Sequence, residues 1–278
     1  MSMDNAEIAR ALAEVGELLD QSCAGEEQVQ AYLAASETIG RLDRPAGQIL
    51  AEEGEEGLKR LPYVTDRMAE AVRELVSTGR LERLDQLRAD AEPEGILDSI
   101  RGIGNALAKA MESQLGIVTL EELERAADDG RLEQLPQIGS ARAKRIRQAL
   151  AERQARRPTL PLADPAPVAE LLSVDEEYRH QAATGQLPGV VTERYNPGRR
   201  PWLPVLHTTR GPRRYAAFYA NTHLAHQLDE TRNWVVIYYG QRRGFGQAMV
   251  ATESQGDLTG HRVVRGREEE TREHYRRW

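Results

Sequence analysis

The chain has 278 residues, of which 40% are hydrophobic and 29% charged, and its formal net charge is −7 at pH 7. A single cysteine excludes an intrachain disulfide, and no apolar run is long enough to cross a bilayer. We therefore expect a soluble, cytoplasmic protein of two domains with no membrane partner.

A hairpin pattern occurs three times in the first half of the chain. LPYVTDRMAEAV begins at residue 61, IRGIGNALAKAM at residue 100 and LPQIGSARAKRI at residue 135. In each copy a tight turn precedes apolar positions at helical spacing, which predicts one supersecondary unit used three times. The second copy has Gly102 and Gly104, and the third keeps Gly139. The first has Tyr63 and Thr65 instead, so we expect its permissive backbone to be lost.

These turns would stand at helix N-termini, where amide N–H groups point outward and the macrodipole favours an anion such as phosphate. Basic residues follow in the third copy, among them Arg142, Lys144 and Arg145. The alternatives are a ligand-free turn and an ordinary solvated helix face. Acidic residues outnumber basic ones up to residue 157, but backbone amides can bind phosphate without a net positive domain.

The order of segments from about Asn5 to Ala151 resembles the N-terminal lyase-like and fingers regions of family X DNA polymerases. These segments are NAEIARALAEVGELLD, QAYLAASETIG, LKRLPYVTDRMAEAV, STGRLERLDQL, IRGIGNALAKAM and LGIVTLEELERAADDGRLEQLPQIG. The resemblance covers slightly more than half of the chain. It implies helix-hairpin-helix units that hold gapped, nicked or abasic DNA, with a monovalent cation at the hairpin carbonyls and repair proteins as partners. The family's polymerase palm has no counterpart here, so nucleotide addition is not expected.

The family's lyase activity, which the resemblance also implies, uses a lysine Schiff base. Ala71 stands at the position of that lysine, and Arg67 at a nearby supporting basic position. Arginine stays protonated and cannot replace the nucleophile. Tyr32 matches a family tyrosine of the same pocket, and Lys59 is close enough in sequence to remain a candidate.

The composition changes in the second half. All six histidines, all three tryptophans and both phenylalanines lie after residue 157, and the stretch 153–167 is a proline- and arginine-rich linker. VAELLSVDEEYRHQAATG and NTHLAHQLDETR have helical spacing, whereas WLPVLHTT, RRYAAFYA, NWVVIYYG, GQAMVATE and GHRVVRG are typical of strands. The fold class predicted is an all-α helix-hairpin-helix half followed by a smaller α+β domain with a mainly antiparallel sheet.

We place the domains at 1–90 (lyase-like), 91–152 (tandem helix-hairpin-helix) and 168–278 (α+β, function unknown). In the last of these, His223, His226 and Glu230 have the i, i+3, i+7 spacing of one helix face and could hold zinc or manganese. His207 joins the two histidines as a catalytic candidate. The alternative for these histidines is packing or hydrogen bonding at a surface.

Basic and aromatic residues alternate between positions 199 and 215, including Arg199, Arg200 and Trp202, which suits backbone contact combined with base stacking. A solvated strand edge is the alternative. The residues expected to bind DNA are Gly102, Ile103, Gly104, Asn105, Lys109, Ile138, Gly139, Ser140, Arg142, Lys144, Arg199, Arg200, Arg213 and Arg214.

The sequence thus predicts a structure-specific, sequence-independent DNA-binding protein of DNA repair without polymerase activity. One alternative is a DNA-processing enzyme, either a metal-dependent nuclease or an abasic-site lyase. In either case the chemistry would lie in the C-terminal domain. Another alternative is a protein-interaction adaptor whose hairpins serve only as scaffolding.

Overall fold

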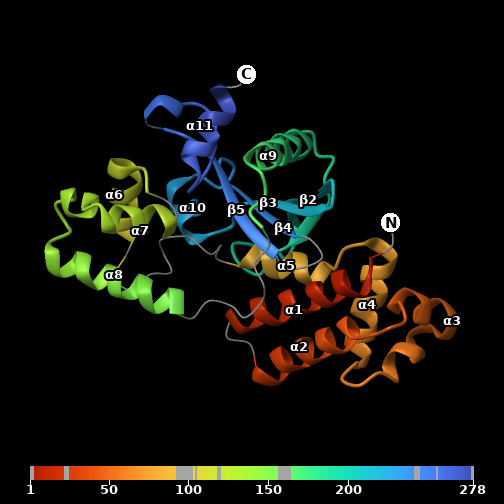
Figure 1. Ribbon diagram of the computed structural model, residues 1–278. Helices are drawn as coiled ribbons and strands as arrows, with labels where there is room; N and C mark the ends of the chain where they lie inside the picture. Colours follow the sequence, from red (N-terminus) through yellow and green to blue (C-terminus); the bar gives the residue numbers. More distant parts are fainter. Residues whose placement is uncertain are drawn as a thin grey trace.

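An all-helical part is followed by a sheet with helices in the computed structural model (Figure 1). The structure describes residues 3–21, 25–91, 103, 105–117, 120–155, 164–240, 245–254 and 256–276. Within them, no helix combines the length and the apolar character needed to span a membrane.

The N-terminal helices share one apolar core. They are α1 (Asn5–Gln21), α2 (Glu26–Gly40), α3 (Ala46–Lys59), α4 (Asp66–Thr78) and α5 (Glu82–Asp90). In α4 the buried residues Met68, Val72 and Leu75 fall at helical spacing and face this core. The helix ends where Gly79 adopts a left-handed conformation with φ 73°, and the chain turns there into α5.

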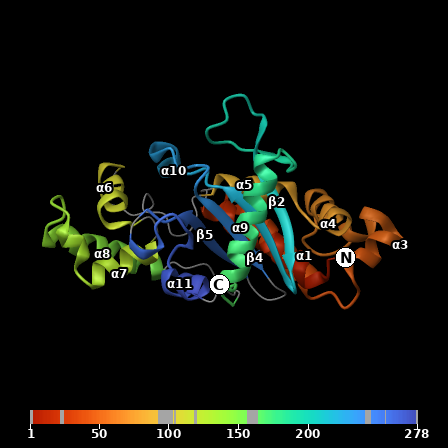
Figure 2. The ribbon, with the colours of Figure 1, turned by 90° about the horizontal axis from the view of Figure 1, so that it is seen from above.

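The tandem region consists of α6 (Asn105–Leu115), α7 (Leu120–Asp128), the 3₁₀ turn η2 (Arg131–Gln134) and α8 (Ser140–Ala155). Its apolar residues form one cluster with a face of the sheet, and two ion pairs join it to the C-terminal part. Arg265 lies 2.9 Å from Glu253 and 3.9 Å from Glu122 of α7, and Arg125 lies 3.3 Å from Glu268. The tandem is therefore packed against the α+β part, and Figure 2 shows the sheet between the two helical groups.

The C-terminal part is a six-stranded antiparallel meander in the order β1-β2-β3-β4-β5-β6. Its elements are α9 (Val168–Ala183), β1 (Gly189–Val191), β2 (Pro201–Arg210), β3 (Arg213–Tyr219), α10 (His223–Leu228), β4 (Val235–Gly240), β5 (Phe245–Thr252), η3 (Gly256–Leu258), β6 (Arg262–Val264) and α11 (Glu268–Arg276). The predicted fold class is confirmed. The short strand β1 and the highly charged helix α11 were not expected from the sequence.

Both faces of the sheet are buried, which explains why its strands are so apolar. In β4, Val235 and Ile237 face α9, whereas Val236 and Tyr238 belong to the cluster on the opposite face. Helix α9 covers the first face with Leu171, Leu172 and Tyr178 among others.

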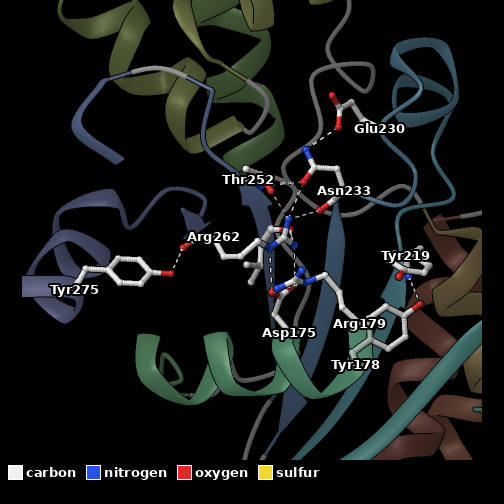
Figure 3. A network of polar contacts seen from close by, with 10 residues as sticks. Asp175, Tyr178, Arg179, Tyr219, Glu230, Asn233, Thr252, Arg262 and Tyr275 are labelled. Atoms are coloured by element: carbon white, nitrogen blue, oxygen red, sulfur yellow. Dashed lines mark hydrogen bonds and ion pairs between the residues drawn. The ribbon is translucent and has the colours of Figure 1, made fainter. Parts of the chain in front are cut away.

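A polar network ties α9 to the far edge of the sheet (Figure 3). Asp175 of α9 is 1% exposed and accepts hydrogen bonds from Arg179 and from Arg262 of β6. Arg262 also donates to the backbone and side-chain oxygens of Asn233, whose amide nitrogen donates to Glu230. Because the Asp175 carboxylate and its two arginines are mutually paired, we assign this network to folding.

Candidate nucleic-acid interface

The third hairpin leads from η2 into α8, and its turn exposes backbone rather than side chains. The Ile138 N–H donates to Leu135 O at 2.9 Å, and Ile138 itself is only 3% exposed. Gly139 and Ser140 follow at the surface, where the first amides of a 16-residue helix begin. The sequence prediction of a hairpin at a helix N-terminus is met by this geometry.

Gly139 is not required by the fold. Its φ lies outside the left-handed region, and a Cβ built on it would meet nothing within 4 Å. A side chain at position 139 would therefore carry no penalty for positive φ. A residue without a side chain at an open helix N-terminus leaves room for something outside the chain to approach the backbone.

The first hairpin has the same backbone hydrogen bond as the third, but different residues at its turn. The Val64 N–H donates to Leu61 O at 3.3 Å, as Ile138 does to Leu135. Tyr63 keeps a left-handed φ of 61° and is 71% exposed, so the expected loss of this backbone conformation is wrong. The turn persists because Val64 is buried in the core beneath it.

An acidic side chain stands at the start of the first hairpin's helix. Asp66 begins α4, where Ser140 begins α8. The Asp66 carboxylate is 2.9 Å from Lys59 and already places a negative charge at this helix N-terminus. An incoming phosphate would be repelled there, so the first and third hairpins differ in their capacity for anions.

The second hairpin lies largely outside the described residues. Gly102 and Gly104 belong to that unplaced part, as do the side chains of Asn105 and Lys109. Ile103 is described and is 6% exposed. Like Ile138, it packs inward, so that only its backbone could meet a ligand.

Helix α8 presents cations beside the third hairpin. Lys144 and Arg145 are exposed, and neither forms an ion pair with a residue that the structure describes. Arg142 donates to the Gln137 carbonyl at 3.3 Å and thereby braces the turn. Arg147 is used differently, because it donates to Ala127 O and to Glu133 and fastens α8 to its neighbours.

A second surface combines aromatic and basic side chains from the loop between β1 and β2, from the start of β2 and from α10. The loop projects from the sheet in Figure 2. Tyr195 is 45% exposed and stacks on His226 with 3.9 Å between ring centroids; Trp202 is 40% exposed and lies 6.4 Å from the same histidine. Arg199 and Arg200 are exposed on this loop and have no ion pair with any described residue. We call Tyr195, Trp202, His226, Arg199 and Arg200 the aromatic loop surface.

Hydrogen bonds to helix α5 anchor the loop of the aromatic loop surface. Tyr195 and Arg199 have left-handed φ values of 53° and 44°, which are strained for residues with a side chain. The Asp90 carboxylate at the end of α5 accepts hydrogen bonds from the N–H groups of Glu193 and Arg194 at 2.7 and 3.0 Å. Helix α10, which carries His226, contacts α6 of the tandem.

Arg213 and Arg214 do not join this surface. The Arg214 Nε lies 2.9 Å from Glu7 of α1, and Arg213 lies 3.5 Å from Glu170 of α9. Alternation along β3 sends the two side chains to opposite faces of the sheet, where each finds a carboxylate. Both arginines therefore hold helices against the sheet.

The single helix face predicted to carry His223, His226 and Glu230 does not extend as far as Glu230. Helix α10 ends at Leu228 because Asp229 adopts a left-handed conformation, so Glu230 does not continue the face that carries His226. His226 Nε2 is 2.8 Å from Asn221 Oδ1, and Glu230 accepts from Asn233. The His223 side chain lies outside the described residues. Elsewhere in the described ranges no group of three or more metal-ligating side chains occurs.

The lyase candidates stand in environments that disfavour a nucleophilic amine. Hydrogen bonds from the Lys59 ammonium to Asp66 and then to Glu56 raise its pKa, which keeps the amine protonated. Ala71 is 5% exposed and Tyr32 is 3% exposed, and burial raises the pKa of the Tyr32 hydroxyl. Arg67 is exposed.

His207, the remaining catalytic candidate, lies on β2 with its Nε2 2.9 Å from the buried Asp85 of α5. A carboxylate that orients an imidazole is one element of general base sites. No sequence pattern pairs these two residues, because they stand 122 positions apart. Arg10, Glu14 and Arg88, which lie nearby, were also missed for this reason.

Comparison with protein-family models gives a match to the SAM-like helix-hairpin-helix tandem over residues 94–152. No curated protein matches the chain significantly. Helix-hairpin-helix tandems typically bind DNA, so the match supports nucleic-acid binding in general. It agrees with the second and third hairpins of the predicted repeat, whereas the likeness to family X polymerases stays a prediction.

Proposed function

We propose that this chain is a structure-specific, sequence-independent DNA-binding protein of DNA repair, which holds gapped or nicked DNA through hairpin amides and does not add nucleotides. The observation that carries the proposal is the third hairpin. Neither the backbone conformation nor the neighbouring atoms at position 139 require a glycine there. The residue lies at the open N-terminus of α8, a helix with exposed cations. Such a turn is shaped for a phosphate.

The aromatic loop surface is suited to gapped or nicked DNA. Phosphate contacts carry no base identity, so hairpin amides alone would not distinguish intact from interrupted duplexes. A gap exposes unpaired bases, and aromatic rings such as Tyr195 and Trp202 can stack on them. The contact between α10 and α6 brings this surface next to the tandem.

The composition of the sheet supports a non-polymerising role. None of the six strands contains an aspartate or glutamate, whereas a polymerase palm holds its metal ions on closely spaced strand aspartates. The Asp85–His207 pair favours DNA processing as the second candidate function. Product analysis of gapped and abasic duplexes with magnesium or manganese, using His207→Ala as the comparison, distinguishes the two.

The direct test compares two matched substitutions. Gly139→Val fills the approach to the third hairpin, and Thr65→Val places the same side chain at the equivalent position of the first hairpin. Losing a hydrogen bond to a charged group costs about 1–3 kcal/mol, so Gly139→Val should weaken binding to a gapped duplex by roughly 5- to 150-fold. Thr65→Val should bind like the parent protein. Circular dichroism checks that both variants are folded; equal affinity of a folded Gly139→Val protein contradicts the proposal.

A further inference from the structure

A cleft of about 860 Å³ lies between the N-terminal helices and the sheet, apart from the hairpins and the aromatic loop surface. Its walls come from α1, the end of α4 and the turn that follows it, α5, and strands β2 to β5. The side chains that concern us are Arg10, Arg80, Arg88, Arg214 and His207. This volume is typical of a site for a small organic molecule.

Two of these arginines already have carboxylate partners. Arg88 binds Glu14 through two hydrogen bonds of 2.7 Å, and Arg214 binds Glu7 at 2.9 Å. Burial alone would lower the pKa of Arg88, but the charge of Glu14 and its hydrogen bonds outweigh burial and raise it. Both pairs are complete in the folded protein.

Arg10 lies between these pairs on α1 and lacks a comparable partner. Its Nη1 is buried and has no hydrogen-bond acceptor among the described residues. Burial lowers the pKa of Arg10 despite the nearby Glu14 and Glu7, with Arg88 and Arg214 adding to the effect. An arginine stays charged in a protein, so this N–H group remains a buried cationic donor without an acceptor.

The Arg10 guanidinium packs against the backbone of the sheet. A Cβ on Gly240 of β4 would approach the Arg10 Cζ to 3.1 Å, so the guanidinium lies against a strand that only glycine leaves uncovered. Arg80 also lines the cleft and forms no ion pair with a described residue, and the Asp85 carboxylate is occupied by His207. Arg10 and Arg80 therefore add two positive charges to the cleft that no ion pair with a described carboxylate balances, and this excess of charge favours an anion there.

We propose that the cleft binds an oxyanion of the phosphate type, with Arg10 as its principal ligand and Arg80 at its edge. The phosphate can belong to a small molecule or to the end of a nucleic acid, since both present the same oxygens to a guanidinium. The site is separate from the hairpins, so it stands even where the DNA-binding proposal fails.

Isothermal titration of the full chain tests this with inorganic phosphate, a deoxynucleoside 5′-monophosphate and the unphosphorylated nucleoside. The two phosphate compounds should bind and the nucleoside should not. Arg10→Met should weaken phosphate binding by about tenfold or more, the usual effect of losing a charged hydrogen bond. The matched control is Arg41→Gln, which removes the same charge from an arginine whose side chain is 81% exposed. It should bind as the parent does.

The affinity of the Gly139→Val protein for a duplex with and without a 5′-phosphate shows whether the bound phosphate comes from a nucleic-acid end or from a small molecule. An Arg10-dependent gain from the terminal phosphate assigns the site to nucleic-acid ends, and a response to the mononucleotide alone assigns it to a small molecule. Arg10→Met should melt no lower than the parent, because its Nη1 contributes no bond to the fold. Equal phosphate binding by Arg10→Met and the parent, or no binding of any phosphate probe, overturns the proposal.

Discussion

If the third hairpin is given the acidic residue of the first, it should bind anions less well. Ser140→Asp places at α8 the carboxylate that Asp66 places at α4. An acidic residue at a helix N-terminus stabilises an exposed helix by about 0.3–1 kcal/mol, so the variant should unfold at the same or a slightly higher temperature. DNA affinity should change in the opposite direction.

The loss of affinity follows from charge. A carboxylate about 4 Å from a phosphate costs about 1 kcal/mol in water and about 4 kcal/mol near a protein surface. We therefore expect Ser140→Asp to weaken binding to a gapped duplex by roughly 10- to 100-fold at low salt. Ser140→Asn, which is similar in size and uncharged, serves as the control and should bind nearly as the parent does.

Fluorescence anisotropy at fixed salt measures the affinity, and thermal unfolding measures stability. A Ser140→Asp protein that is as stable as the parent and binds DNA equally well would refute the assignment of phosphate binding to this helix N-terminus. The reciprocal change, Asp66→Ser, removes one of the two partners of Lys59. Because the Asp66 side chain is 89% exposed, this ion pair should contribute little to folding, and Asp66→Ser should unfold at nearly the parent's temperature.

Three further predictions concern the fold, the aromatic loop surface and sequence preference. Glu14→Gln should lower the free energy of unfolding, measured by urea denaturation, by about 3–5 kcal/mol, because it leaves the Arg88 guanidinium buried without its carboxylate. The double variant Glu14→Leu, Arg88→Met, which removes both charges, should recover part of the loss. Tyr195→Ala should weaken binding to a gapped duplex by about 1–3 kcal/mol and leave binding to an intact duplex unchanged, so an equal loss on both would show that Tyr195 does not stack on an unpaired base. Intact duplexes of random sequence and equal length should bind alike, and a tenfold preference among them would indicate base contacts that hairpin amides cannot make.

Local periodicity was enough to predict most of the helices, the first and third hairpins and most of the strands. Apolar spacing identifies α4 and α8, and short aromatic or β-branched runs bounded by Gly, Pro or Asn identify β2 to β5. The Glu230 prediction failed for a local reason, since Asp229 adopts the left-handed conformation that ends α10. Asp is among the few side chains that tolerate this conformation, and nothing in the helical pattern of the segment signals the stop.

The cleft could not be predicted, because its contacts join distant parts of the chain. Glu14 and Arg88 are separated by 74 positions, and Glu7 and Arg214 by 207. In the sequence these residues are ordinary charges on helix and strand surfaces. Only the docking of α1 and α5 against the sheet makes them partners and leaves Arg10 with an unused donor.

The acidic net charge of the chain is compatible with DNA binding because many of its charges are paired locally. Arg44 lies 2.5 and 2.6 Å from Glu52 and Glu53, whereas Lys144 and Arg145 on α8 have no such partners among the described residues. Few cations are thus available to displace counterions, and binding should depend on salt as for roughly three to five phosphates, a log–log slope of about −3 to −4.5. Lys144→Gln with Arg145→Gln should make this slope shallower by about two, while Arg44→Gln should leave it unchanged. A parent slope near −10, or an effect of Arg44 equal to that of the α8 pair, would show that DNA lies on the acidic helices and would contradict the placement of DNA at the third hairpin.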